Sequence, residues 1–211
     1  MDELAKEYVV SFFERTLMLH GDRPEAVRWT APGQTAHYRA LLDIGDLAGA
    51  KILDYGCGTG GLYAFLLERG VPVDYAGYDI NPKLIEHARN KYPEARFEVF
   101  DIEQQELAEE FDYILLCGVF NLKVQGLEET ICGVLRKLYP RCRKGLAFNA
   151  LSDLNPKKDF ELNYLNPGVM LAFAAGELSP HVSLRLDRIP HDFFLFVYRT
   201  TQKFNEMRNP A

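Results

Sequence analysis

The sequence lacks the features that mark several large classes of protein. No uninterrupted apolar run approaches the ~20 residues that a membrane-spanning helix needs, and the opening MDELAKEY has neither the basic region nor the cleavage site of a signal peptide. The chain has 4 cysteines, but none forms a C-x-x-C pair and no histidine cluster accompanies them. We therefore expect a cytoplasmic protein with reduced cysteines, no metal site and no membrane partner.

Positive charge is also scarce. The 211 residues include 24 Lys and Arg against 30 Asp and Glu, which gives a net charge of −6 and a pI of about 5.4. Proteins that bind nucleic acid need a Lys/Arg surface to neutralise phosphates, so we expect no nucleic-acid partner. The one basic cluster, PRCRKG at 140–145, is typical of favourable charge at a helix C-terminus.

From residue 51 onward, short apolar runs alternate with helical stretches. The expected strands are Lys51–Tyr55, Tyr75–Tyr78, Phe97–Phe100, Tyr113–Cys117 and Leu146–Asn149. The expected helices between them are Gly60–Arg69, Pro82–Lys91, Glu103–Glu109 and Leu127–Tyr139. This alternation indicates right-handed β-α-β crossovers and an α/β fold, a doubly wound parallel sheet with helices on both faces.

The two ends of the chain depart from this alternation. The spacing of apolar residues predicts helices over Glu3–Leu19 and Thr35–Ile44, with a loop between them. Near the other end, only RIPH separates the strand-like runs Val182–Asp187 and Asp192–Arg199. A connection this short cannot cross over a sheet, so we expect these two strands to pair antiparallel.

An insertion precedes these last strands, at about residues 150–180. Within it, Asn166-Pro167 is a helix start signal, and the helix is expected to reach about Glu177. The layout therefore predicts an N-terminal helical segment followed by one α/β unit that carries an insertion.

The stretch ILDYGCGTGG at 52–61 raises the question of the cofactor. Gly56, Gly58 and Gly61 satisfy G-x-G-x-x-G, the glycine spacing of a dinucleotide-binding turn. Asp54, however, lies two positions before the first glycine, where a carboxylate would repel a pyrophosphate. S-adenosylmethionine instead carries a sulfonium and an ammonium group. We expect Asp54 to accept from the ammonium, directly or through water, and the amides from Tyr55 to Gly60 to surround the amino-acid part.

Two further acidic residues end the next two expected strands. Asp79 follows Gly56 by 23 residues and could accept both ribose hydroxyls, a position that fits NAD equally well. Asp101, with the N–H of Ile102 behind it, matches the exocyclic amine and a ring nitrogen of adenine. Carboxylates at three successive strand ends are hard to explain by packing alone.

These stretches resemble a known family. ILDYGCGTGG, YAGYDINPKLIEHAR, VFDIEQ, FDYILLCGVFNL and RKGLAFNAL are similar to successive motifs of the class I S-adenosylmethionine-dependent methyltransferases, over about Lys51–Arg199. The resemblance implies a Rossmann-like seven-stranded sheet of order 3-2-1-4-5-7-6 with strand 7 antiparallel. It implies cofactor contacts at Asp54, Tyr55, Gly56, Gly58, Asp79, Ile80, Asp101, Ile102, Cys117 and Gly118.

The resemblance also suggests a division of the chain. Residues 1–45 are expected to form an N-terminal helical lid, and residues 46–211 the methyltransferase domain, within one structural domain overall. Trp29 and Tyr38 are candidate lid aromatics over the cofactor, or else core residues. His37 departs from the pattern, because relatives with a similar lid often have an arginine on that helix.

The motif for methylation of nucleic-acid bases or glutamine, DPPY or NPPY, does not follow the fourth expected strand. We therefore expect methyl transfer to an oxygen or nitrogen of a small-molecule acceptor. His191 is the candidate base, with Asn121 and Tyr164 as further candidate catalytic residues and Asn149 beside them. The alternatives are a non-catalytic regulator that binds S-adenosylmethionine and an NAD-dependent oxidoreductase.

Overall fold

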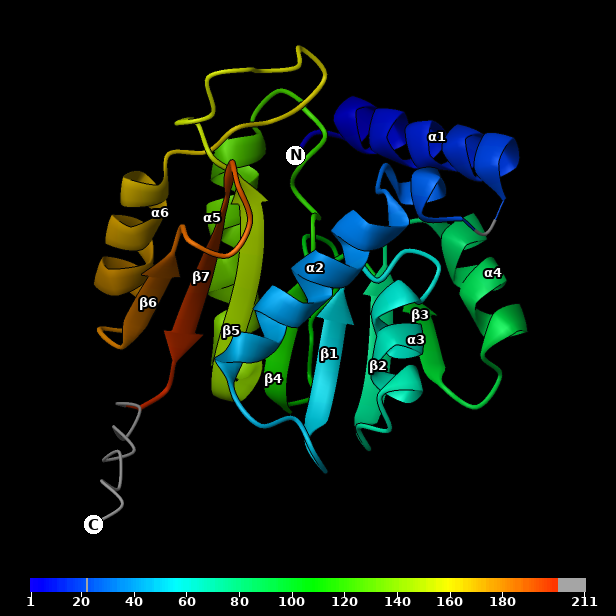
Figure 1. Ribbon diagram of the computed structural model, residues 1–211, viewed down its shortest axis with the longest axis horizontal. Coiled ribbons are helices and arrows are strands. Elements are labelled where there is room, and N and C mark those ends of the chain that lie inside the picture. The colour runs from blue at the N-terminus through cyan, green and yellow to red at the C-terminus, as the bar shows by residue number, and fades with distance from the viewer. Residues whose placement is uncertain (22, 201–211) are drawn as a thin grey trace.

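A seven-stranded sheet forms the centre of the molecule (Figure 1). The computed structural model describes residues 1–21 and 23–200, so residues 201–211 of the expected domain lie outside the described part. The strands are β1 (Lys51–Tyr55), β2 (Asp74–Asp79), β3 (Arg96–Val99), β4 (Phe111–Leu116), β5 (Cys142–Leu151), β6 (Val182–Arg185) and β7 (Asp192–Tyr198). Their order is β3-β2-β1-β4-β5-β7-β6, and β7 runs antiparallel to both neighbours. The fold class and strand order expected from the sequence are confirmed.

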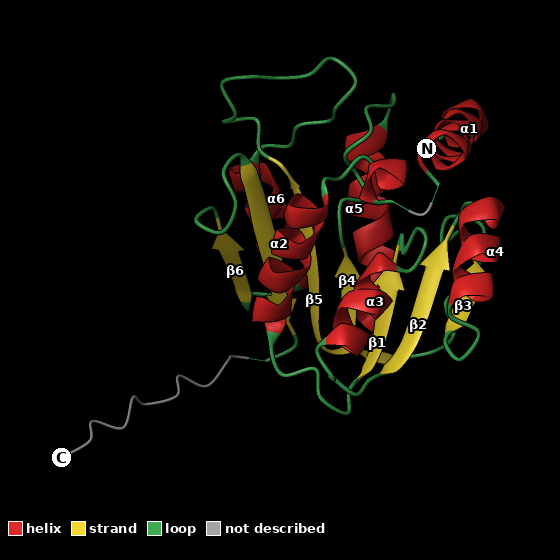
Figure 2. Ribbon diagram, turned by 45° about the vertical axis from the view of Figure 1, so that its right-hand side comes forward, coloured by secondary structure: helices red, strands yellow, loops and turns green. Residues whose placement is uncertain are grey.

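Helices cover both faces of this sheet (Figure 2). They are α1 (Glu3–His20), α2 (Ala31–Leu41), α3 (Gly61–Glu68), α4 (Pro82–Lys91), α5 (Leu127–Leu138) and α6 (Pro167–Phe173), with short turns η1 (Pro24–Val27), η2 (Leu42–Ile44), η3 (Tyr139–Arg141) and η4 (Ala174–Leu178). Buried residues of α2, α3 and α4 pack on one face, and those of α5 and α6 on the other. Helix α1 crosses the edge toward which the parallel strands point (Figure 1).

Side-chain caps start several of these helices where the sequence predicts them. Asn81 accepts hydrogen bonds from the backbone N–H groups of Lys83 and Leu84, at 3.0 and 3.2 Å, and Pro82 occupies the first helical position of α4. Asn166 caps α6 in the same way through the N–H of Val169. Of the helices that the structure describes, none is long and apolar enough to cross a membrane.

Two expectations about helices are wrong. No helix forms over Glu103–Glu109, where the chain makes a turn and then an extended segment. Asp101 accepts from the N–H of Glu103 at 2.8 Å, and Gln105 accepts from the N–H of Asp101, so local side-chain bonds replace helical ones. Helix α2 begins at Ala31 rather than at Thr35, because Thr30 caps it and a proline occupies its first turn.

Strand β7 is the most deeply buried strand of the sheet. All seven of its residues are buried, and it pairs with β5 from Gly145↔Tyr198 to Leu151↔Asp192. Its alternating side chains enter both cores, with Phe193 in the cluster beside α5 and Phe194 in the cluster beside α2. The loop that connects β7 to β6 makes the antiparallel hairpin expected from its length.

Candidate active site

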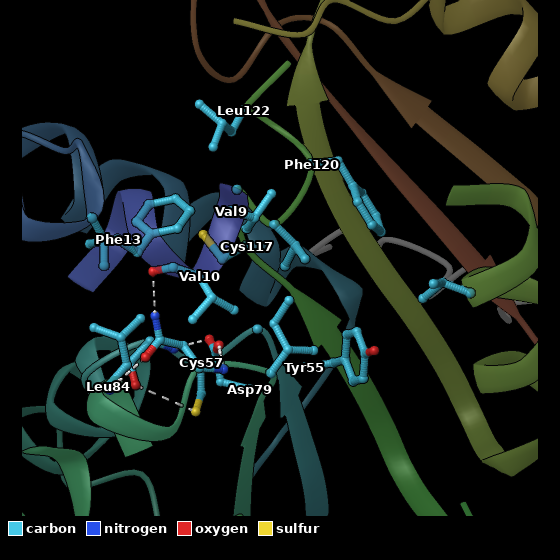
Figure 3. A pocket seen from close by; sticks show the side chains of 18 of the residues that line it. Val9, Val10, Phe13, Tyr55, Cys57, Asp79, Leu84, Cys117, Phe120 and Leu122 are labelled. Atoms are coloured by element: carbon cyan, nitrogen blue, oxygen red, sulfur yellow. Dashed lines mark hydrogen bonds between the residues drawn. The ribbon is translucent and has the colours of Figure 1, made fainter. Parts of the chain in front are cut away.

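A cavity lies between α1 and the carboxyl ends of the parallel strands (Figure 3). In doubly wound folds this edge of the sheet is where ligands bind. The loops after β1, β2, β3 and β4 contribute one wall, and α1, η1 and α2 contribute the other. The polar and glycine residues of the wall are Lys6, Gln34, Gly56, Gly58, Thr59, Gly61, Asp79, Asn81, Asp101, Glu103, Gly118 and Thr130.

The glycine loop after β1 allows other segments to approach its backbone closely. Gly56 has a φ of +80°, and a Cβ atom there would lie 2.5 Å from Cγ2 of Val119. Its N–H donates to the carbonyl of Tyr78 at 2.7 Å, which fixes the loop to the end of β2. Val119 can therefore pack this closely on the loop only because position 56 carries no side chain.

Asp79, at the end of β2, lines the cavity and organises its floor. Its carboxylate accepts from the backbone N–H groups of Gly58 and Asn81, both at 2.9 Å. Burial raises the pKa of Asp79, and the bonds from Asn81 and Gly58 oppose that rise. The remaining lone pairs of the carboxylate are free to accept from hydroxyl groups of a ligand.

Asp101 and Glu103 form an acidic rim after β3, and α1 places one cation against it. The ammonium of Lys6 lies 2.7 Å from Oδ2 of Asp101 and 3.4 Å from Oε2 of Glu103. These pairs are only partly exposed, and they tie α1 to the body of the protein over the cavity. With Asp79, the wall carries three carboxylates and two ammonium groups, because the N-terminal nitrogen of Met1 also lies 2.8 Å from Oε1 of Glu103. The remaining negative charge favours cationic or hydroxyl-bearing ligands over a diphosphate.

Asp54 lies behind the cavity rather than on its wall. It is 2% exposed, and its Oδ2 accepts from the hydroxyl of Tyr75 at 2.7 Å. Burial raises the pKa of Asp54 to about 7, while the Tyr75 bond opposes this change and the charge of Asp79 adds to it. Asp54 is therefore not part of the cavity wall, and its contact with a ligand ammonium, expected directly or through water, stays a prediction.

Ile102 also differs from its expected position. It is buried outside the cavity wall, and its N–H donates to the hydroxyl of Tyr55 at 3.4 Å instead of facing the ligand space. Tyr55 and Ile80 line the cavity, and their contact with a cofactor stays a prediction. Burial raises the pKa of Tyr55, so its phenol stays neutral.

The loop after β4 supplies the expected Cys117 and Gly118. Both line the cavity, and the N–H of Gly118 donates to Oδ1 of Asn149 at 2.9 Å. Burial raises the pKa of the Cys117 thiol well above its ordinary value, so this sulfur is no base and no nucleophile. Beyond Gly118 the wall becomes apolar, with Val119, Phe120, Leu122, Val124, Leu127 and Val134.

The structure does not bring the three candidate catalytic residues to the cavity wall. His191 is exposed just before β7, with a φ of +73°, and its carbonyl accepts from the N–H of Ser152. Tyr164 accepts from the N–H of Asp159 through its hydroxyl, at 2.8 Å. Asn121 is not part of the cavity wall, although its Nδ2 would lie 3.3 Å from a Cβ atom on Gly118. Their positions do not support the catalytic roles suggested for them.

Helix α1 lines the cavity with apolar residues that the expectation of a helical lid did not identify. Val9, Val10 and Phe13 face Cys117, Phe120 and Leu122 across the cavity (Figure 3). An amphipathic pattern identifies this helix, but the pattern does not tell whether its apolar face covers a core or a cavity. Gln34, one turn before Tyr38 on α2, was missed for the same reason.

Comparisons with known proteins give the same description of this fold. A family profile described as "Methyltransferase domain" matches residues 52–141. A candidate methyltransferase of Mycobacterium tuberculosis is 29% identical over 158 residues, which cover 72% of this chain and 94% of that protein. The magnesium-protoporphyrin O-methyltransferase of Rhodobacter capsulatus is 27% identical over 168 residues, with 71% of this chain and 70% of that protein covered.

A solved structure shares the architecture across nearly the whole chain. The magnesium protoporphyrin IX methyltransferase of Synechocystis, determined with bound S-adenosylmethionine, matches with a TM-score of 0.65 at 18% identity. The match covers 95% of this chain and 98% of that protein. At this level of identity the likeness shows the fold.

Proposed function

Because this chain belongs to the class I S-adenosylmethionine-dependent methyltransferases, we propose that it transfers the methyl group of that cofactor to an oxygen or nitrogen of a small-molecule acceptor. The protein is an enzyme of this family, and S-adenosylmethionine is its cofactor. The observation that carries the proposal is the cavity whose polar end is acidic and whose other end is apolar.

The residues of the polar end fit the cofactor. Gly56 and Gly58 line the cavity with backbone alone, and Val119 and Val27 pack so close to them that a Cβ atom at either position would meet a valine side chain. Asp79 would hold the ribose hydroxyls, and Asp101 would accept from the adenine amine. Cys117 and Gly118 would face the methionine part, and the ionised form of Asp54 would favour its positive charge from behind the wall.

The lid expected over residues 1–45 enters this proposal through α1 and α2. The hydroxyl of Tyr38 and the amide of Gln34 lie against Gly61, at the start of α3. Neither group makes a hydrogen bond within the described part of the chain, and both residues line the cavity. We assign both groups to binding the carboxylate of the cofactor's amino-acid part. They take the place of the arginine that similar lids carry.

When bound, the cofactor would supply a methyl group on a sulfonium, and the neutral thioether that remains after transfer is a good leaving group. The protein binds and orients the two reactants and excludes water from them. The apolar residues beyond Gly118, together with Val9 and Phe13, surround the space for the acceptor. Two relatives are named as O-methyltransferases, of magnesium-protoporphyrin and of malonyl-[acyl-carrier protein], which supports an oxygen nucleophile.

Calorimetry with S-adenosylhomocysteine tests the cofactor assignment. We expect D79A to weaken binding by about 10- to 100-fold, because a charge-assisted hydrogen bond contributes ~1.5–3 kcal/mol. D74A is the matched control, since Asp74 is exposed at the opposite end of the same strand. Equal affinities for D79A and D74A would mean that the ribose lies elsewhere.

A second candidate is a protein that binds S-adenosylmethionine without methylating anything. It is favoured by the position of His191, Asn121 and Tyr164, since none of these three lies on the cavity wall. Release of S-adenosylhomocysteine in the presence of a panel of acidic, phenolic and amine acceptors would exclude it. The NAD-dependent alternative conflicts with the acidic rim, because its carboxylates disfavour the diphosphate of NAD. We therefore expect the fluorescence of NADH to stay unchanged when it is mixed with the protein.

A further inference from the structure

A buried chain of hydrogen bonds connects α2 to the loop after β4. On α2, Nε2 of His37 lies 2.8 Å from Oδ2 of Asp192, the first residue of β7. The same carboxylate oxygen accepts from Nδ2 of Asn149 on β5 at 3.2 Å, and Oδ1 of Asn149 accepts from the N–H of Gly118 at 2.9 Å. The three side chains are 6%, 5% and 0% exposed, so solvent does not compete for these bonds.

The partners of His37 fix the orientation of its ring. Its Nδ1 lies 2.7 Å from the carbonyl of Gly33, and its Nε2 faces the carboxylate of Asp192. The carbonyl can only accept, so Nδ1 donates to it, and Nε2 and the carboxylate share the second hydrogen bond. A buried polar pair of this kind adds little net stability compared with apolar packing, and its best-attested use is to fix one arrangement of the chain.

Trp29 rests on this network and forms part of the cavity wall. Its ring centroid lies 4.1 Å from that of His37, and a Cβ atom on Gly118 would lie 2.5 Å from Cζ2 of Trp29. Gly118 has a φ of +68°, a backbone conformation that favours glycine. Because this position has no side chain, the indole can pack directly against its backbone. The network therefore holds both the indole and the loop on which it packs.

We propose that His37, Asp192 and Asn149 are positioning residues that hold Trp29 and Gly118 where the cofactor's methionine end meets the acceptor. None of the three lines the cavity, so they act through Gly118 and Trp29 rather than by contact with a ligand. The evidence for this role is the chain of hydrogen bonds from His37 through Asp192 and Asn149 to Gly118. An asparagine at position 192 would still offer one oxygen to both His37 and Asn149, whereas an alanine would offer none. The assignment of the ligand rests on the proposed function, but the positioning of Trp29 does not.

Trp29 is the only tryptophan of the sequence, so its emission reports on this network in the apo protein. We expect D192A and H37F to shift the emission to longer wavelength and to increase quenching by acrylamide. H37F keeps an aromatic ring beside Trp29 but has no donor for Asp192. The same two variants should bind S-adenosylhomocysteine about tenfold more weakly or worse, while D192N should stay within about threefold of the wild type on the same scale.

Two controls separate positioning from stability. R136A removes the exposed Arg136–Glu177 ion pair far from Trp29 and should leave both readouts unchanged, and W29F should abolish the emission signal. Far-UV circular dichroism identifies variants that do not fold. If D192A or H37F does not fold, D192N and H37Q are compared with the wild type instead. Wild-type emission and affinity in a folded D192A, or losses in D192N as large as in D192A, would overturn the proposal. If the wild type does not bind S-adenosylhomocysteine, the proposed function fails and the emission of the apo variants still tests the network.

Discussion

Asp54 shows how burial changes the behaviour of a single carboxyl group. Its folded-state pKa is about 7, against an ordinary value of 3.8. Between these two values the folded chain keeps a proton that the unfolded chain has lost. The free energy of unfolding therefore falls as pH rises from about 4 to 7 and is constant, with respect to this group, above that range.

D54N tests this pH dependence, because asparagine cannot ionise and can still accept from Tyr75. The stability of D54N relative to the wild type should rise by about 2–3 kcal/mol between pH 5 and pH 8. Urea denaturation at both pH values measures the difference. The control is D74N, at an exposed aspartate on the neighbouring strand. A relative stability of D54N that does not change with pH would show that Asp54 is ionised throughout.

Gly56 shows how a missing side chain allows another side chain to approach the loop closely. G56A should destabilise the protein and weaken S-adenosylhomocysteine binding at least tenfold, because the added methyl group meets Val119. Gly70 has a similar φ of +62° but open space around it, so G70A measures the backbone cost alone, about 1 kcal/mol. Equal losses of stability and of affinity in the two variants would contradict a role for the close approach at Gly56.

At the level of elements, α1 is joined to the body by ion pairs at two places. Lys6 contacts Asp101 and Glu103 at the cavity, and Glu14 contacts Lys83 of α4 at 2.6 Å. Only the first pair lies at the rim where the cofactor would bind. Removal of each contact in turn therefore distinguishes attachment of the helix from closure of the cavity.

K6A should speed the dissociation of S-adenosylhomocysteine by up to about fivefold, since a partly buried pair contributes ~1 kcal/mol. K83A removes the other contact, at a lysine side chain that is 58% exposed, and should leave the rate unchanged. Stopped-flow displacement measures both rates. Equal acceleration by the two variants would show that α1 acts only as a packed helix and not through Lys6.

The elements of the sheet could be predicted because their signals are local. Lys51–Tyr55 and Pro82–Lys91 have the bounds expected from apolar runs and from the Asn81 cap. The segment 103–109 could not be predicted, because side-chain bonds of Asp101 and Gln105 overrule its helical composition. At the site, the motif located the glycine loop and Asp79. It could not tell that the Asp54 carboxylate turns toward Tyr75, since that depends on which face of β1 is covered by which helix.

At the scale of the whole molecule, two apolar clusters share one sheet. Phe193 and Phe194 are adjacent in β7, both fully buried, and each belongs to a different cluster. Because the same strand contributes to both, we propose that residues 1–200 unfold as one structural domain, the N-terminal helices included.

F193A and F194A should each lower the free energy of unfolding by about 3–5 kcal/mol, the usual cost of truncating a buried phenylalanine. Far-UV circular dichroism and Trp29 emission should follow one coincident transition in both variants and in the wild type. If Trp29 emission changed first, the N-terminal helices would form a separate cooperative unit.

The position of β7 between β5 and β6 also determines when the protein can become active during its synthesis. Strand β6 is translated before β7 but reaches the sheet only through it, so a nascent chain that stops short of β7 leaves the edge of β5 open to pairing with other chains. Asp192, which anchors His37 and Asn149, arrives with the same strand. The hairpin of β6 and β7 must therefore leave the ribosome before Asp192 can connect α2 to Asn149 and the Gly118 loop.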